Sequence, residues 1–228
     1  MAAGPRVGLI VPSSNTVAEP DFYRHLPGEA TLHTARMYLD EVTPEQEAVM
    51  LDEHLPGALR DLATVQPDVV VFACTSAGAL RGKAYESRLV EQIGSVTGAR
   101  VAVSVAASVR AAILRAGAER VGVATPYSDA INDTLRASLQ EDGIPVCQIH
   151  GMGIVANASI GAVCPSDVAA FACETYRDAN IDLLFVSCTN FRAFEARSEI
   201  ESELGVPVLT SNQVAFAAAL EPLFSQSA

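Results

Sequence analysis

The sequence predicts an α/β fold of two pseudo-symmetric halves, each a mainly parallel sheet flanked by helices, with a cleft between the halves. Three observations support this prediction. Short apolar runs alternate with longer amphipathic stretches along the 228 residues, a pattern typical of parallel sheets covered on both faces. Two sequence motifs recur at one fixed spacing, and polar residues follow each of the recurring runs.

Eight short runs are predicted as strands, and several of them, such as Val7–Val11 and Val69–Ala73, are continuously apolar, as expected of strands buried on both faces. The predicted strands are Val7–Val11, Thr31–Met37, Val69–Ala73, Arg100–Val103, Val121–Ala124, Val146–His150, Leu183–Ser187 and Pro207–Leu209. Amphipathic stretches between them predict helices, among them Pro44–Val65, Ala84–Thr97, Val105–Ala116, Asp129–Glu141 and Asp167–Ala179. Glycines that follow helical stretches are expected to end them, namely Gly98, Gly117, Gly143 and Gly205.

An internal repeat defines the two halves. Arg6–Pro12 (RVGLIVP) matches Arg120–Pro126 (RVGVATP), and Val71–Thr75 (VFACT) matches Phe185–Thr189 (FVSCT), both 114 positions later. Two separate motifs with one offset indicate two copies of one α/β unit. We predict a first half of residues 1–104 plus about 206–228, and a second half of residues 105–205, because the final strand and helix are expected to return to the first half.

Charge and hydropathy exclude several classes of partner. Fifteen basic and 27 acidic residues give a net charge of −12, and no basic cluster is present. A nucleic-acid or anionic-membrane partner is therefore not expected. No apolar run approaches the roughly 18 residues of a membrane span. A small anionic substrate stays compatible with the charge, because a local set of backbone N–H groups can bind an anion.

The five cysteines fall into two groups. Their odd number and the absence of a recognisable export signal argue against a disulfide framework and favour a reducing, cytoplasmic location. Cys147, Cys164 and Cys173 are expected to be small core residues. Cys74 and Cys188 differ from them, because they occupy equivalent positions in the repeat and each is followed by a threonine.

The repeated strand ends form the candidate catalytic constellation. Pro12-Ser-Ser-Asn15 and Pro126-Tyr-Ser-Asp129 end the first strand of each half, and Cys74 and Cys188 end a later one. Ligands of parallel sheets bind beyond the carboxyl ends of strands, so the two thiols should face each other across one cleft. A helix that starts at each cysteine would lower its pKa from about 8.5 toward neutrality. Such thiolates suit proton transfer or covalent addition next to a carboxylate.

Three other polar residues have both a functional and a structural interpretation. Tyr127 matches Ser13 in the repeat, which places it at the cleft. Asn15 could instead cap the helix that begins near Val17. Asn157 lies in a glycine-rich loop, where asparagine is common for conformational reasons.

Two competing motifs are weak. Gly151-Met-Gly153-Ile-Val-Ala156 resembles a dinucleotide fingerprint, but no acidic strand end follows about 20 residues later. The four histidines, His25, His33, His54 and His150, have no ligand spacing and no C-x-x-C is present. Neither a nucleotide cofactor nor a metal site is therefore expected.

The motif Val11-Pro-Ser-Ser-Asn15-Thr16, with Cys74 and Cys188 in the half-repeats, resembles the maleate cis-trans isomerase family of the aspartate/glutamate racemase superfamily. The resemblance covers essentially the whole chain. It implies two flavodoxin-like halves, no cofactor and a homodimer. It also implies that the substrate carboxylates are held by Asn15, Tyr127, Asn157 and the backbone N–H groups of Thr75, Ser76, Thr189 and Asn190.

The resemblance implies a mechanism as well. The Cys74 thiolate would add to one alkene carbon of maleate, rotation about the resulting single bond would follow, and elimination would give fumarate. Cys188 would supply and recover the proton at the neighbouring carbon. The sequence alone does not rank the two cysteines as nucleophiles. The cleft is expected to be closed to water but roomy, because rotation needs space.

Alternative functions stay open on the sequence. The superfamily's amino-acid racemases usually have Cys-Asn-Thr where this chain has Cys74-Thr-Ser, and its arylmalonate decarboxylases keep only the second of the two cysteines. Racemisation or decarboxylation of a small carboxylic acid, including in relatives tied to ectoine utilisation, is the second hypothesis. A carboxylate-binding module without catalysis is the third, and the retention of both thiols argues against it.

Overall fold

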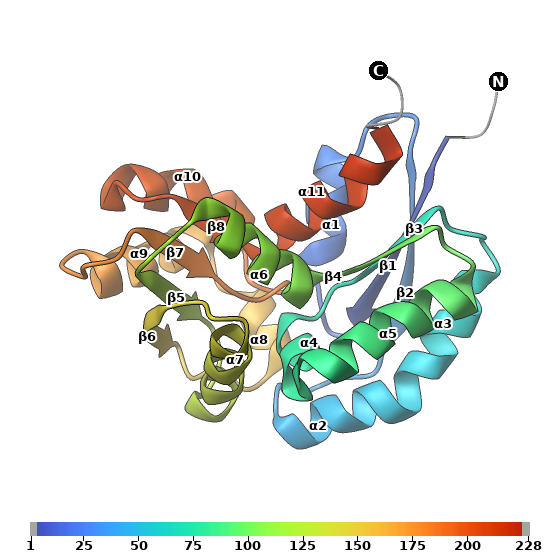
Figure 1. Ribbon diagram of the computed structural model, residues 1–228, viewed down its shortest axis with the longest axis horizontal. Coiled ribbons are helices and arrows are strands. Elements are labelled where there is room, and N and C mark those ends of the chain that lie inside the picture. Colours follow the sequence, from blue (N-terminus) through green and yellow to red (C-terminus); the bar gives the residue numbers. More distant parts are fainter. Residues whose placement is uncertain (1–3, 225–228) are drawn as a thin grey trace.

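The structure is a computed structural model that describes residues 4–224. It contains two four-stranded, wholly parallel sheets with the strand orders β2-β1-β3-β4 and β6-β5-β7-β8. The sheets form two lobes that lie side by side in Figure 1, with helices α6 and α11 crossing the region between them. The predicted fold of two α/β halves is confirmed.

The first lobe contains the strands and helices of the N-terminal part of the chain. Its strands are β1 (Arg6–Pro12), β2 (Thr31–Met37), β3 (Val69–Phe72) and β4 (Val101–Ser104). Its helices are α1 (Ala18–His25), α2 (Pro44–Val49), α3 (Leu55–Ala63), α4 (Thr75–Leu80) and α5 (Gly82–Thr97). A π-helical turn, η1 (Met50–His54), joins α2 to α3, so the predicted helix Pro44–Val65 is one helical segment with a wider turn in its middle.

The second lobe repeats this arrangement. Its strands are β5 (Val121–Thr125), β6 (Val146–Gly151), β7 (Leu183–Val186) and β8 (Val208–Thr210). Its helices are α7 (Asp129–Glu141), α8 (Asn157–Gly161), α9 (Pro165–Tyr176) and α10 (Ala193–Leu204), while α6 (Val105–Ala116) and α11 (Ser211–Phe224) connect the lobes. Val7 pairs with Val69 and Val121 with Leu183, so the sheet register repeats at the spacing seen in the sequence.

The last strand and helix divide between the lobes. β8 pairs with β7 in the second sheet, whereas α11 packs against β3, β4 and α6. The prediction that the final strand returns to the first half is therefore wrong for β8, because its hydrogen-bonding partner lies in the second sheet. The other boundaries of the proposed halves remain a prediction.

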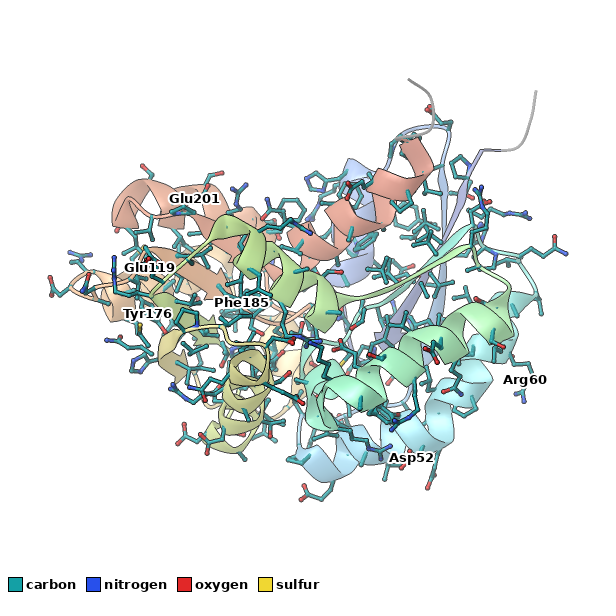
Figure 2. The ribbon with its side chains drawn as sticks, viewed as in Figure 1. Asp52, Arg60, Glu119, Tyr176, Phe185 and Glu201 are labelled. Atoms are coloured by element: carbon teal, nitrogen blue, oxygen red, sulfur yellow. The ribbon has the colours of Figure 1, made fainter. Side chains whose placement is uncertain are left out.

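The central strands of both sheets are fully buried. All four residues of β3 and all four of β7 are inaccessible or nearly so. In the second lobe, the hydroxyl of Tyr176 donates to the carbonyl oxygen of Val123 at 2.6 Å and accepts from its N–H at 3.1 Å. Figure 2 shows Tyr176 and Phe185 within this lobe, whereas Arg60 extends from α3 at the edge of the molecule. The rigid strands fix where their carboxyl ends, and hence the site, lie.

A buried ion-pair network joins the two lobes. The guanidinium of Arg110 on α6 pairs with Glu86 on α5 and, at 2.6 Å, with Asp142 at the end of α7. Arg110 and Glu86 are both buried. Because helices of both lobes contribute to the network, it resists relative movement of the lobes on this side of the molecule.

Candidate active site

A closed cavity lies where the carboxyl ends of strands from both sheets meet. It is lined by Pro12, Asn15, Leu39, Val42, Glu47, Cys74, Thr75, Ser76, Tyr127, Asn157, Cys188, Thr189 and Asn190. Every site residue that the sequence predicted is in this set. The structure therefore brings these residues together at one cavity, and their functional roles remain predictions.

The two cysteines occupy equivalent turns after β3 and β7. Cys74 directly precedes α4 in an extended conformation, and it is 4% exposed. Cys188 is 6% exposed and has a positive φ of 99°, which side-chain-bearing residues rarely adopt and which costs about 1–3 kcal/mol. Its backbone N–H donates to the hydroxyl of Ser211 at 3.0 Å, which helps to hold this conformation.

Burial raises the pKa of both thiols, which corrects the expectation of lowered values. Desolvation, together with the nearby carboxyl of Glu47, raises the pKa of Cys74 well above its usual 9.0. Desolvation raises the pKa of Cys188 to about 11, although hydrogen bonds from the Tyr127 hydroxyl and the Asn190 N–H oppose the shift. Helix α4 has only six residues, so its dipole does not offset burial. A thiolate in this cavity therefore needs a base or a bound ligand to stabilise it.

Tyr127 stays protonated in this environment. Desolvation, followed by the proximity of Cys188, raises its pKa well above 10. Its hydroxyl is therefore available as a hydrogen-bond donor inside the cavity at any physiological pH. It lies after β5, as its match with Ser13 in the repeat predicted.

Asn15 combines the capping role and a position at the site. Its side-chain oxygen accepts from the N–H groups of Val17 and Ala18, each at 3.0 Å, at the start of α1. Its Nδ2 donates to the Thr189 hydroxyl at 3.1 Å, and Thr189 donates to the carbonyl oxygen of Ala73 at 2.9 Å. This series of hydrogen bonds links strand ends of the two lobes, and the second N–H of the Asn15 amide takes no part in it.

Asn157 and Asn190 form a second bridge between the lobes. Nδ2 of Asn190 donates to the carbonyl oxygen of Asn157 at 2.7 Å and to its side-chain oxygen at 3.1 Å. The amide of Asn157 then donates to Ser14 at 2.8 Å, and the N–H of Thr16 donates to Asn190 at 2.9 Å. The amides are thus fixed in orientation by the protein before any ligand arrives.

Glu47 is the polar lining residue of this cavity that was not predicted from the sequence. It lies on α2, is completely buried, and accepts a short hydrogen bond from the Ser76 hydroxyl through Oε1. Its other oxygen, Oε2, has no partner. Desolvation raises its pKa to about 8. The signal was present in the helical periodicity, because Glu47 is spaced four and eight residues from the buried Leu51 and Leu55.

Ser211, at the start of α11, connects the two cysteine turns. Its hydroxyl oxygen receives hydrogen bonds from the Thr75 hydroxyl and the Cys188 N–H, both at 3.0 Å. The neighbouring Asn212 donates to Asp21 at 2.8 Å and to the Thr189 carbonyl at 3.0 Å. Neither residue stands out in the sequence, because α11 reaches the site only through the tertiary fold.

The cavity is too small for a dicarboxylate as it stands. Its space for water-sized occupants is about 10 Å³, roughly what one water molecule needs. Leu39 and Val42 cover it from the loop before α2, and that loop is tied to the second lobe by hydrogen bonds from Val42 N–H to Val155 and from Asn157 N–H to Asp40. The lining side chains are buried, but the expected roominess is absent, so the cavity must widen before a substrate can enter.

The other three cysteines do not line this cavity. Cys147 and Cys164 are exposed and Cys173 is buried, so the core interpretation was wrong for the first two. Within residues 4–224, no cluster of three or more His, Cys, Asp or Glu side chains could hold a metal ion. Over the same residues, no helix has the length and apolar character to cross a membrane.

Comparison with known proteins places the chain in a family. The model of the arylmalonate decarboxylase family matches residues 7–225. A maleate isomerase from Nocardia farcinica is 28% identical over 216 residues, covering 90% of this chain and 85% of that protein. An arylmalonate decarboxylase from Bordetella bronchiseptica is 29% identical over 218 residues, covering 94% and 89%.

Solved structures agree with these relatives. The crystal structure of the maleate isomerase Iso from Pseudomonas putida S16 aligns with a TM-score of 0.88 at 26% identity, covering 96% of this chain and 92% of that one. The resemblance to maleate isomerases predicted from the strand-end motifs is thereby confirmed. Because the family model spans nearly the whole sequence, the chain belongs to the arylmalonate decarboxylase family, which here has maleate isomerases among its relatives.

Proposed function

We propose that this enzyme is a cofactor-independent isomerase that converts maleate to fumarate. The observation that carries the proposal is the presence of two buried thiols, Cys74 and Cys188, at equivalent strand ends of one closed cavity. A carboxylate binder needs no second thiol, whereas addition and elimination at a double bond need a nucleophile and a proton carrier. The relatives named maleate isomerases support the same reading.

The proposed reaction proceeds through a thioether. The Cys74 thiolate adds to one alkene carbon of maleate, and the π electrons move toward the adjacent carboxylate. Cys188 gives its proton to the neighbouring carbon, and the former double bond becomes a single bond that rotates. Cys188 then recovers the proton, the carbon–sulfur bond breaks, and fumarate leaves with the Cys74 thiolate restored.

Neutral hydrogen-bond donors are proposed to hold the two substrate carboxylates. The candidates are Asn15, Tyr127, Asn157 and the backbone N–H groups of Thr75, Ser76, Thr189 and Asn190, all of which line the cavity. The described lining contains no Arg, Lys or His. Amide and hydroxyl dipoles fixed before binding stabilise the developing enediolate charge without reorganising.

The wider context is also part of the proposal. We propose that the enzyme works in the cytoplasm as a homodimer and binds neither nucleic acid nor membrane. Cysteine usage supports the reducing compartment, because all five cysteines are free thiols. The dimer rests on the family resemblance and is tested by the molar mass of the protein in solution.

Proton NMR of the enzyme with maleate tests the function directly. We expect the fumarate signal to grow with the wild type, to vanish with Cys74→Ser and to be strongly reduced with Cys188→Ser, because a hydroxyl is a far weaker nucleophile and acid than a thiol. Cys173→Ala, which changes a buried cysteine outside the cavity, should leave most activity. Full activity in Cys74→Ser would overturn the proposed mechanism.

A decarboxylase or racemase is the second candidate, and the match to the arylmalonate decarboxylase family favours it. It would use the same cavity to stabilise an enediolate, without covalent addition. Incubation with an arylmalonate, aspartate or glutamate in deuterated water distinguishes it. Release of carbon dioxide, or deuterium at a stereocentre, with no fumarate from maleate would establish this alternative, and binding of all of these compounds without turnover would indicate a binding module.

A further inference from the structure

The cavity holds one ionisable group that the proposed mechanism does not use, the carboxyl group of Glu47. This side chain is completely buried, and desolvation of an unpaired carboxylate is costly. No described cation lies in the cavity to offset that cost, since the other titratable lining residues are Cys74, Tyr127 and Cys188. A buried carboxyl group beside a reacting thiol therefore calls for a chemical explanation.

Ser76 contacts both Glu47 and Cys74. The Ser76 hydroxyl donates to Oε1 of Glu47, and the Ser76 oxygen is 3.9 Å from Sγ of Cys74. When the hydroxyl proton of Ser76 points to Glu47, its oxygen lone pairs are free to accept the S–H of Cys74. All three side chains are buried, so water does not compete for these contacts.

The surroundings of Cys74 offer little else that would stabilise its thiolate. The helix after Cys74 has six residues, and burial together with the Glu47 charge works against ionisation of the thiol. The second cavity thiol, Cys188, has its own donors, the Tyr127 hydroxyl and the Asn190 N–H, which lies 3.3 Å from its Sγ. Of the two cavity thiols, Cys74 alone is connected to a carboxyl group by a hydroxyl among residues 4–224.

We infer that Glu47 accepts the proton of Cys74 through the hydroxyl of Ser76, so that these three side chains form a proton relay that generates the attacking thiolate. The Cys74 proton moves to the Ser76 oxygen as the Ser76 proton moves to Oε1 of Glu47. The products are a Cys74 thiolate and a neutral Glu47, and no charge is created. This inference rests on the proposed role of Cys74 as the nucleophile.

The relay also resolves a problem of charge. The charge of an ionised Glu47 would repel a dicarboxylate without reacting with it, whereas after proton transfer the same charge lies on the attacking sulfur atom and is used in forming the carbon–sulfur bond. The single negative charge moves to the sulfur atom that attacks the substrate. When the thioether breaks, the charge returns to Cys74 and the reverse transfer restores Glu47.

Alkylation of the two cavity thiols by iodoacetamide tests the relay without any substrate. Rates are followed by peptide mass spectrometry as a function of pH for the wild type, Glu47→Gln, Ser76→Ala and the double variant. Cys188 serves as an internal reference, because it lines the same cavity. Circular dichroism verifies that each variant is folded, and Ser76→Ala, which removes one small hydroxyl group, is the mildest of the changes.

For the wild type, we expect Cys74 alkylation to rise with pH and to level off near pH 8, where the coupled pair loses its first proton. Glu47→Gln should remove this levelling, so that Cys74 alkylation continues to rise above pH 8 and is no slower than in the wild type, because glutamine carries no charge that opposes the thiolate. Ser76→Ala should slow Cys74 alkylation at least about tenfold at pH 8, because the Ser76 hydroxyl favours the thiolate and a thiol whose pKa is one unit higher has a tenth of the thiolate. The double variant should be no slower than Ser76→Ala, and Cys188, on which the Glu47 charge acts less than on Cys74, should change less than Cys74 in every variant.

Two results would overturn the relay. One is unchanged Cys74 alkylation in both single variants, and the other is an equal loss at Cys74 and Cys188, which would indicate altered access alone. The maleate assay is scored separately. If Cys74 alkylation depends on Glu47 but maleate is not converted, the proposed substrate is refuted and the relay stands. If maleate is converted normally but Cys74 alkylation does not depend on Glu47, the relay is refuted and the proposed function stands. A change confined to the KM for maleate would make Glu47 a binding residue and reject the relay.

Discussion

Replacing Glu47 by glutamine should stabilise the folded protein increasingly as the pH rises. The pKa of Glu47 is raised from 4.5 to about 8 by burial, so the folded state binds this proton more tightly than the unfolded state does. The stability that comes from Glu47 is therefore complete below pH 4.5 and is lost as the pH rises toward 8. Because proton binding is coupled to folding, the contribution of Glu47 to the free energy of unfolding falls by about 1.4 kcal/mol per pH unit between pH 4.5 and about 8.

Glutamine keeps the oxygen that accepts from Ser76 but does not ionise. Between about pH 5 and about pH 7.5, the difference in unfolding free energy between variant and wild type should therefore move by about 3 kcal/mol in favour of Glu47→Gln. Urea denaturation followed by circular dichroism at both pH values measures this difference. Glu45→Gln is the matched control, because Glu45 lies on the same helix and is exposed, so its effect should not depend on pH in this way.

A difference that stays constant between the two pH values would refute the reasoning. It would mean that Glu47 ionises in the folded protein as easily as in the unfolded chain, so that water reaches the closed cavity. The same pH dependence in Glu45→Gln would also contradict it, because the effect would then reflect the removal of any negative charge from an acidic protein.

The other predictions concern the nucleophile, metals and the contact between the lobes. A trapped complex with maleate should add one substrate mass to the peptide that holds Cys74, and an adduct on the Cys188 peptide instead would reverse the assigned roles. Activity should survive dialysis against EDTA, and a loss restored by a divalent metal would contradict the proposed cofactor independence. Arg110→Met leaves Glu86 and Asp142 without their buried cation and should cost about 3–5 kcal/mol in urea denaturation; a change below about 1 kcal/mol would show that the network does not stabilise the fold.

Much of the fold follows from the sequence because its signals are local. The predicted runs Thr31–Met37, Val105–Ala116 and Asp129–Glu141 coincide with β2, α6 and α7, since strand and helix periodicities depend on neighbouring residues. Glycines that follow helices mark their ends, as Gly98 does with a φ of 72° after α5. The helix expected to start at each cysteine is present after Cys74 as α4, whereas after Cys188 the next helix, α10, begins only at Ala193.

The sequence by itself determined the two α/β units, the position of their strand ends and the proximity of Cys74 to Cys188. It could do so because two copies of one unit have equivalent strand ends, so residues far apart in the sequence can be predicted to lie at the same place in the fold. Only the tertiary structure decided the environment of those thiols. The raised pKa of Cys74, the closed cavity and the contact between Glu47 and Ser76 depend on how α2 and the loop before it pack over the strand ends. Desolvation and a hydrogen bond between residues 29 positions apart in the chain have no local sequence signature, and they set the chemistry of this site.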